Sequence, residues 1–207
     1  YRQNSYPPSL NQLVLSDYES LSSRIAFRLI NTASNQSFLK TVPHIPWMDL
    51  SIVFYLYIQG NDNGIMTAAV SDYHTKTWGI TADELYTQSL LNTPRLFPPV
   101  ISSMACILEN LDPEHLQYNP SLPETPFYVL TNKNGINGAA CVLYKDVIKN
   151  FAEGMDRNIL ILPSSIHEVL LLPDDDQLPY RDLADLVTFI NQTEVPAEDR
   201  LSNQVYR

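Results

Sequence analysis

Hydrophobic side chains recur at helical spacing in several parts of the chain. After Ser16-Asp17, a pair of favoured N-cap residues, apolar positions continue every three or four residues up to Ile30 and predict a first helix. Residues 81–91 begin with a capping box, in which Thr81 and Glu84 each satisfy a backbone N–H of the other. Further helices are predicted over residues 71–78, 101–110, 145–154 and 179–190.

Runs of β-branched and aromatic residues predict strands that pair as hairpins. Leu50–Gln59 and Ile65–Val70 flank the turn sequence of residues 60–64. The later strands are expected at Phe127–Thr131, Ala139–Leu143, Asn158–Leu162, Ile166–Leu172 and Gln204–Tyr206. Because hairpins join antiparallel strands, we expect an α+β fold, with a largely antiparallel sheet and helices packed on one face.

Proline content marks a boundary between two parts of the chain. Four of the 15 prolines lie in residues 112–126, which we interpret as a linker. It separates an N-terminal α+β lobe, residues 1–111, from a C-terminal lobe, residues 127–207, with the order ββαββα and a last strand. Both lobes combine hairpins with helices, so two similar lobes are expected. The chain begins at Tyr1 rather than Met, and we expect the N-terminal lobe to be truncated.

The acidic charge of the chain limits its partners. Its 207 residues include 23 Asp and Glu but 13 Lys and Arg, a formal net charge of −10. Residues 1–111 carry 8 acidic and 6 basic side chains, whereas residues 112–207 carry 15 and 7, so the acidity lies mostly in the second lobe. Neither nucleic acid nor a membrane surface is expected to bind, and a basic protein is the partner that the charge favours.

Apolar runs and cysteine usage favour a soluble cytoplasmic protein. The longest apolar run, Ile52–Ile58, is far shorter than the roughly 20 residues that span a bilayer. Cys106 and Cys141 both lie among apolar neighbours and are expected to be buried, reduced thiols.

The densest polar cluster between predicted strands consists of Ser164, Ser165, His167 and Glu168. It is open to three interpretations: a turn with capping hydroxyls, a ligand site, or a serine nucleophile with a histidine base. In an extended segment Ser165 and His167 would point to one face, about 7 Å apart, which is a poor nucleophile–base pair. The G-x-S-x-G signature of serine hydrolases does not occur.

Two further places are candidates for ligand binding. Asn132 precedes the glycine-containing segment 134–138, which lies between predicted strands and not before a helix, as a phosphate-binding loop would. Gly135 and Gly138 are therefore expected to supply positive φ angles in a turn. Asn92 and Arg95 follow a predicted helix and are suited either to an anion or to capping of helix carbonyls.

Metal and cofactor sites are not expected. The four histidines are scattered without i,i+4 spacing, and neither cysteine belongs to a C-x-x-C pair. His167-Glu168 lacks the second histidine of a zinc-binding H-E-x-x-H, because position 171 is leucine. Asp174–Asp176 lack the spacing of a calcium loop and are expected to form a solvated turn.

Four sequence runs in combination carry a resemblance to a known family. They begin at Val42-Pro43-His44, Trp78-Gly79-Ile80-Thr81, Tyr128-Val129-Leu130-Thr131-Asn132 and Ile161-Leu162-Pro163-Ser164-Ser165. Over residues 15–207 the chain resembles an uncharacterised family of unknown function found in Gram-positive anaerobes, including gut clostridia. The resemblance implies a bacterial protein but no known reaction, cofactor or catalytic residue.

The sequence thus favours a non-catalytic binding or accessory protein of unknown ligand. The alternative is a hydrolase or transferase that uses the Ser/His/Glu cluster of residues 164–168, so whether the protein is an enzyme stays open.

Overall fold

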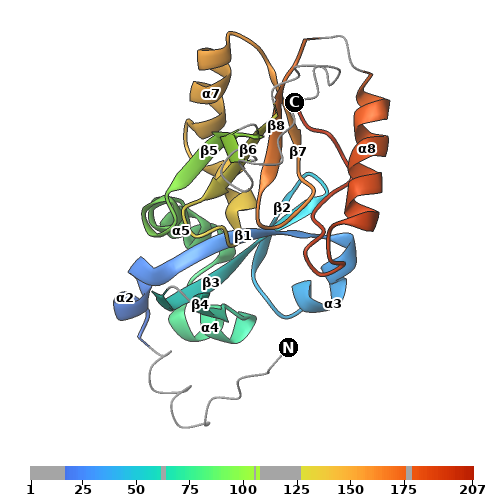
Figure 1. The fold of residues 1–207 in the computed structure, drawn as a ribbon. Coiled ribbons are helices and arrows are strands. Elements are labelled where there is room, and N and C mark those ends of the chain that lie inside the picture. The colour runs from blue at the N-terminus through green and yellow to red at the C-terminus, as the bar shows by residue number, and fades with distance from the viewer. Residues whose placement is uncertain (1–16, 62–63, 105, 108–126, 176–178) are drawn as a thin grey trace. The chain divides into compact units, whose positions relative to one another are not determined.

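The computed structural model of the chain describes residues 17–61, 64–104, 106–107, 127–175 and 179–207. Contacts divide it into two compact units, each built on an antiparallel four-stranded sheet (Figure 1). Unit 1 holds the chain up to Phe27 together with Thr32–Leu96, and unit 2 holds Arg28–Asn31 together with Phe97–Arg207. The predicted α+β class and the antiparallel pairing are confirmed.

Unit 1 combines a sheet in the order β1-β3-β2, with β4 paired to β3, with several short helices and the 15-residue helix α5. The long hairpin predicted after residue 50 is confirmed, with pairing from Tyr55↔Ala69 to Asn61↔Gly64. The elements are α2 (Tyr18–Leu21), η1 (Ser22–Arg24), β1 (Ile25–Asn31), η2 (Ala33–Asn35), α3 (Gln36–Leu39), β2 (His44–Trp47), β3 (Leu50–Asn61), β4 (Gly64–Ala69), α4 (Asp72–Trp78) and α5 (Ala82–Leu96).

The helix predicted from residue 17 to residue 30 is wrong. One turn of α2 and a short 3₁₀-helix, η1, are followed by strand β1. Five of the seven residues of β1 are buried, on both faces of the strand. A strand that is covered on both sides loses the alternation of apolar and polar residues, so its sequence pattern is easily mistaken for that of a helix.

Unit 2 contains a four-stranded sheet in the order β5-β6-β8-β7, in which every pair is antiparallel. The predicted pairing of the strands on either side of Pro163 is confirmed. The elements are β5 (Pro99–Ser103), β6 (Tyr128–Asn132), η3 (Gly138–Leu143), α7 (Val147–Met155), β7 (Ile159–Leu162), β8 (Val169–Pro173) and α8 (Tyr180–Thr193).

Three predicted elements of this unit differ from the structure. Residues 99–103 form strand β5, where the start of a helix was expected, and residues 139–143 belong to a 3₁₀-helix rather than a strand. The expected last strand is a single bridge between Ile161 and Tyr206. The predicted linker, residues 112–126, lies outside the described residues, and unit 2 begins before it because β5 pairs with β6.

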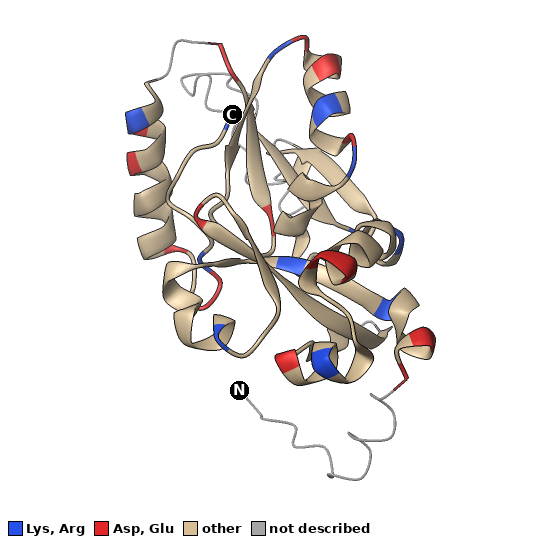
Figure 2. Cartoon of the chain, turned by 180° about the vertical axis from the view of Figure 1, so that it is seen from behind, with Lys and Arg blue, Asp and Glu red and all other residues tan. Residues whose placement is uncertain are grey.

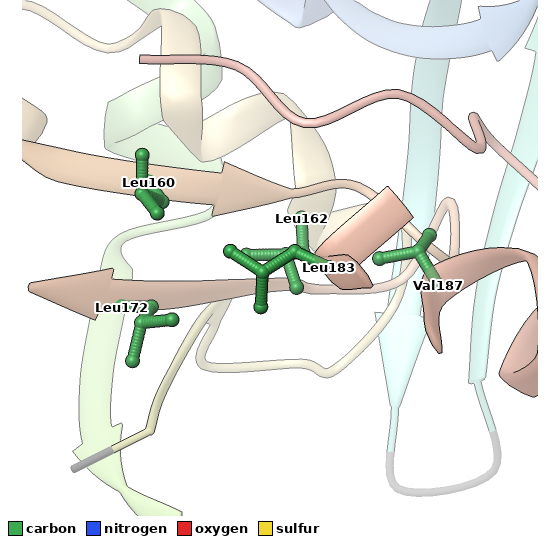
Figure 3. Packing of buried hydrophobic residues seen from close by; sticks show 5 residues of the cluster. All are labelled: Leu160, Leu162, Leu172, Leu183 and Val187. Carbon is green, nitrogen blue, oxygen red and sulfur yellow. The ribbon is translucent and has the colours of Figure 1, made fainter. Parts of the chain in front are cut away.

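The sheet of unit 2 is covered on both faces rather than one. Leu183 and Val187 of α8 pack on leucines of β7 and β8 (Figure 3). Full burial of each such side chain stabilises the fold by about 1.5–3 kcal/mol. Tyr128 belongs to the opposite face, where its ring contacts Phe151 of α7 at a centroid distance of 5.0 Å. Figure 1 likewise draws α7 and α8 on opposite sides of this sheet.

Candidate functional site

The polar cluster between β7 and β8 is held by a second segment of the chain. Three backbone hydrogen bonds of 2.8 to 3.0 Å tie residues 163–166 to residues 199–202. Ser164 and Ser165 are consequently buried, with exposed fractions of 8% and 5%. The hydroxyl of Ser165 accepts the backbone N–H of His167 at 3.0 Å. Ser165 therefore caps a turn, the first of the three interpretations that the sequence left open.

The two ring nitrogens of His167 have separate neighbours. Nδ1 accepts the backbone N–H of Asn137 at 3.3 Å, so in the neutral ring the proton is on Nε2. Nε2 lies 3.7 Å from Oδ1 of Asp199, and both side chains are partly exposed. The imidazole thus joins the turn before η3 to the segment that follows α8.

Asn132, at the end of β6, shapes the turn that follows it. Its amide nitrogen donates to the carbonyl of Ile136 at 2.8 Å, and its Oδ1 accepts the backbone N–H of Asn134 at 3.0 Å. Gly135 has a φ of 65°, as predicted for a turn glycine. Asn132 is therefore buried and occupied within its own turn.

Gly138 brings this turn close to the loop that carries His167. Its φ is not positive, contrary to the prediction. A Cβ at this position would lie 2.8 Å from the backbone nitrogen of Asn132, and closer still to Thr131 Oγ1 and the His167 carbonyl oxygen. Thr131 Oγ1 donates to that same carbonyl at 2.8 Å. The missing side chain is thus what permits the two loops to touch.

Sequence reasoning missed Asn137 and Asp199 as members of this cluster. Asn137 adopts a left-handed conformation with φ of 56°, which asparagine tolerates better than most residues, so the Asn-Gly pair was the available signal. Its Oδ1 is buried without a hydrogen-bond partner among the described residues. Asp199 carried no signal, since it lies 32 positions from His167 in the sequence.

Glu168 and the two unit 1 candidates have different surroundings. Glu168 is half-buried directly before β8 and forms no ion pair within the described part of the chain. The amide of Asn92 donates to the carbonyls of Ser22 and Ile25 at 2.7 and 2.9 Å, and Arg95 donates to that of Ser23 at 2.8 Å. Both unit 1 side chains therefore satisfy backbone carbonyls in and next to η1.

The acidic turn after β8 is not fully solvated, contrary to the prediction. The carboxylate of Asp174 is 4% exposed, and its Oδ2 lies 3.0 Å from Nε of Arg207. The hydroxyl of Tyr180 donates to the same oxygen at 3.0 Å. Asp175 is exposed, and Asp176 lies outside the described residues. No group of three His, Cys, Asp or Glu side chains suited to a metal ion occurs among the residues that the structure describes.

The two cysteines have opposite environments. Cys141 in η3 is fully buried, as predicted, and its Sγ donates to the carbonyl of Thr131 at 3.4 Å. Burial raises the pKa of this thiol to about 12, so it is protonated and unreactive at neutral pH. Cys106 is exposed, contrary to the prediction.

The family assignment rests on a comparison with protein-family models. A model described as a family of unknown function (DUF5688) matches residues 1–207. The chain therefore belongs to this family. Comparisons with curated proteins and with solved structures gave no match. Within the described residues, every helix is too short or too polar to cross a bilayer.

Proposed function

We propose that the protein is a non-catalytic binding or accessory protein, acting in the cytoplasm of a Gram-positive anaerobic bacterium. One observation carries this proposal: the groups that would form a catalytic site are engaged in holding loops together. Ser165 accepts a backbone N–H, and Nδ1 of His167 accepts another. Acyl transfer by a serine needs a basic nitrogen within about 2.6–3.2 Å of the hydroxyl. Here Nδ1 of His167 already accepts the Asn137 N–H, which leaves the proton of a neutral ring on Nε2.

The alternative, a hydrolase or transferase, has one observation in its favour. Asp199 lies 3.7 Å from Nε2 of His167, as a carboxylate that orients an imidazole would. The remaining ring nitrogen, however, accepts the Asn137 N–H instead of a serine hydroxyl. Cys141 is no substitute nucleophile, because its pKa of about 12 keeps it protonated.

Ligand binding by Asn132, Ser164, Ser165, His167 and Glu168 stays a prediction. It is favoured by the buried Oδ1 of Asn137, an acceptor with no hydrogen-bond partner among the described residues. A buried acceptor of this kind costs about 1–3 kcal/mol, which a bound donor group would recover. For Asn92 and Arg95, the carbonyls that they already bind favour the capping role over an anion site.

A fluorophosphonate probe tests whether Ser165 is a nucleophile. We expect no labelling of the native protein, measured by mass spectrometry, because a serine nucleophile without a base does not react with such probes. Labelling that the Ser165→Ala variant abolishes and the Ser202→Ala variant retains would overturn the proposal. The binding role predicts that the full chain, used as bait, retains basic proteins from a native bacterial lysate at low salt and releases them at high salt.

A further inference from the structure

Helix α8 has one face in the core of unit 2 and one face that meets solvent. Leu183 and Val187 form the inner face and pack on the sheet. On the outer side, the exposed fractions of Leu186 and Phe189 are 43% and 63%. These two side chains are three positions apart and therefore adjacent on the helix surface. They form an apolar pair rather than two isolated exposed residues.

Two acidic side chains lie next to this pair, toward the N-terminus of α8. Asp182 and Asp185 are exposed, and each lies four positions before one of the two apolar residues, Leu186 and Phe189 respectively, which places all four on one side of the helix. Figure 2 shows red acidic positions in the first turns of α8. Arg181 is the one basic residue in the sequence of α8. We refer to Asp182, Asp185, Leu186 and Phe189 as the α8 face.

The charge of the α8 face decides which occupant it suits. A second copy of the chain would bring a net charge of −10 toward another −10 and two more aspartates toward these two. A neutral apolar partner would leave the aspartates at its rim without ion pairs. A basic amphipathic segment offers apolar side chains to Phe189 and Leu186, and lysines or arginines to the aspartates.

We propose that the α8 face docks a basic, amphipathic segment of a protein partner, with Phe189 as its apolar anchor. The inference rests on the proposed binding function and names the partner's chemistry. The apolar pair is small, so binding is weak and depends on the flanking charges, which act more through encounter rate and specificity than through buried area. Because both aspartates are exposed, added salt weakens the complex.

The test uses the full chain and a fluorescein-labelled helical peptide of leucine and lysine, with fluorescence anisotropy as the readout. We expect the lysine peptide to bind and the same peptide with glutamate for lysine not to bind. Phe189→Ser together with Leu186→Ser should raise the Kd at least tenfold. Asp182→Asn together with Asp185→Asn should raise it too and flatten its dependence on salt.

Matched controls lie on α5. Leu91→Ser changes a leucine that is 72% exposed, and Asp83→Asn changes an exposed first-turn aspartate, as Asp182 is in α8. Both control variants should bind the lysine peptide like the wild type. Circular dichroism and thermal unfolding check that every variant folds.

Three results would overturn the inference: no binding of the lysine peptide, equal binding by the α8 variants and the wild type, or self-association that the Phe189→Ser change removes in sedimentation. None of these results bears on Ser165, so the proposed function can hold even if the inference about the α8 face fails. Labelling of Ser165 by the fluorophosphonate probe would instead overturn the proposed function, whatever the peptide does.

Discussion

At the residue scale, Gly138 is the position where the candidate site has no room for a side chain. Gly138→Ala would push a methyl group against Thr131 Oγ1, the Asn132 nitrogen and the His167 carbonyl. We expect a loss of about 3 kcal/mol in unfolding free energy, the upper end of typical overpacking, because two of the three atoms belong to the backbone and the third is hydrogen-bonded to a backbone carbonyl. Urea unfolding followed by circular dichroism measures the change.

Gly154→Ala is the matched control for this prediction. Gly154 lies inside α7, and an added Cβ would meet no atom within 4 Å. Alanine in a helix is favoured over glycine by about 1 kcal/mol, so this variant should be slightly more stable than the wild type. Equal stabilities of the two alanine variants would contradict the close approach at Gly138.

The same scale shows what the sequence could predict of the candidate site. The cluster of Ser164, Ser165 and His167 was visible because these residues are adjacent, and a capping role for Ser165 follows from ordinary turn chemistry. Nothing in the sequence indicated that Asn137 and Asp199 are neighbours of His167. Their position depends on the turn before η3 and the segment after α8 both meeting the loop that carries His167. A glycine needed for close approach has the same signature as one needed for a positive φ, which is why Gly138 was misinterpreted.

At the element scale, the start of α4 depends on the protonation of His74. Its Nδ1 accepts the backbone N–H of Ser71 at 2.9 Å, and the hydroxyl of Ser71 lies 2.9 Å from the same nitrogen. The ring also stacks on Trp78 at 5.3 Å between centroids. Only the neutral ring has a lone pair for this capping bond. Protonation of His74 would therefore release the cap.

The stability of the protein should accordingly fall as the pH falls. Burial lowers the pKa of His74, so the folded chain prefers the neutral ring more strongly than the unfolded chain does, where the pKa is about 6.5. This stabilisation is complete above about pH 6.5 and is lost as the pH falls through the lowered pKa of the folded state. Thermal unfolding between pH 7.5 and pH 5, roughly the range in which histidine titrates, measures it.

His74→Gln isolates this contribution. Glutamine is a favoured acceptor at the third position of a capping box and does not titrate, so the variant should keep α4 and show a shallower pH dependence. His44→Gln, in the same unit, is the control variant, because Nδ1 of His44 lies 3.0 Å from the carbonyl of Val42 and caps none of the described helices. An unchanged slope in the His74 variant would show that the cap does not sense pH.

Element prediction succeeded where local chemistry dominates and failed where burial is two-sided. The capping box of α5 is confirmed, since Thr81 and Glu84 exchange hydrogen bonds of 2.8 to 3.2 Å. The hairpin of β3 and β4 had a clear turn sequence. Strand β1 and the 3₁₀-helix η3 gave no such signal, because five of the seven residues of β1 and four of the six residues of η3 are buried and polar positions do not alternate with apolar ones.

At the scale of the whole molecule, contacts between distant residues decide the division into units. The last residues of β1 belong to unit 2, and the amide of Asn31 donates to the carbonyl of Leu201 at 2.8 Å. Proline content and charge could suggest that the chain has two parts. They could not show that Arg28–Asn31, four residues of an early strand, belong to the second part. Such an assignment needs pairings across 170 positions, for which sequence periodicity holds no information.

The ion pair between Asp174 and Arg207 is another long-range contact, and it can be tested. Arg207→Gln removes the positive charge that lies 3.0 Å from a carboxylate that is 4% exposed. We expect a loss of about 2 kcal/mol, less than for a fully buried pair because half of Arg207 meets solvent. Urea unfolding of this variant measures the loss.

The double variant, Arg207→Gln with Asp174→Asn, separates the pair from its surroundings. Asparagine has no charge to desolvate, so the double variant should be more stable than Arg207→Gln alone. If the stability losses of the two single variants add up to the loss of the double variant, the pair contributes no coupling energy.

The pairing of residues 199–206 with the β7–β8 connection also has a consequence for biosynthesis. Five backbone hydrogen bonds join residues 161–166 to this later segment. A nascent chain that has been synthesised as far as α8 can form the β7–β8 hairpin, but the connection between its strands still lacks those bonds. The segment with Ser164, Ser165 and His167 therefore reaches its final form only after residues 199–206 have left the ribosome.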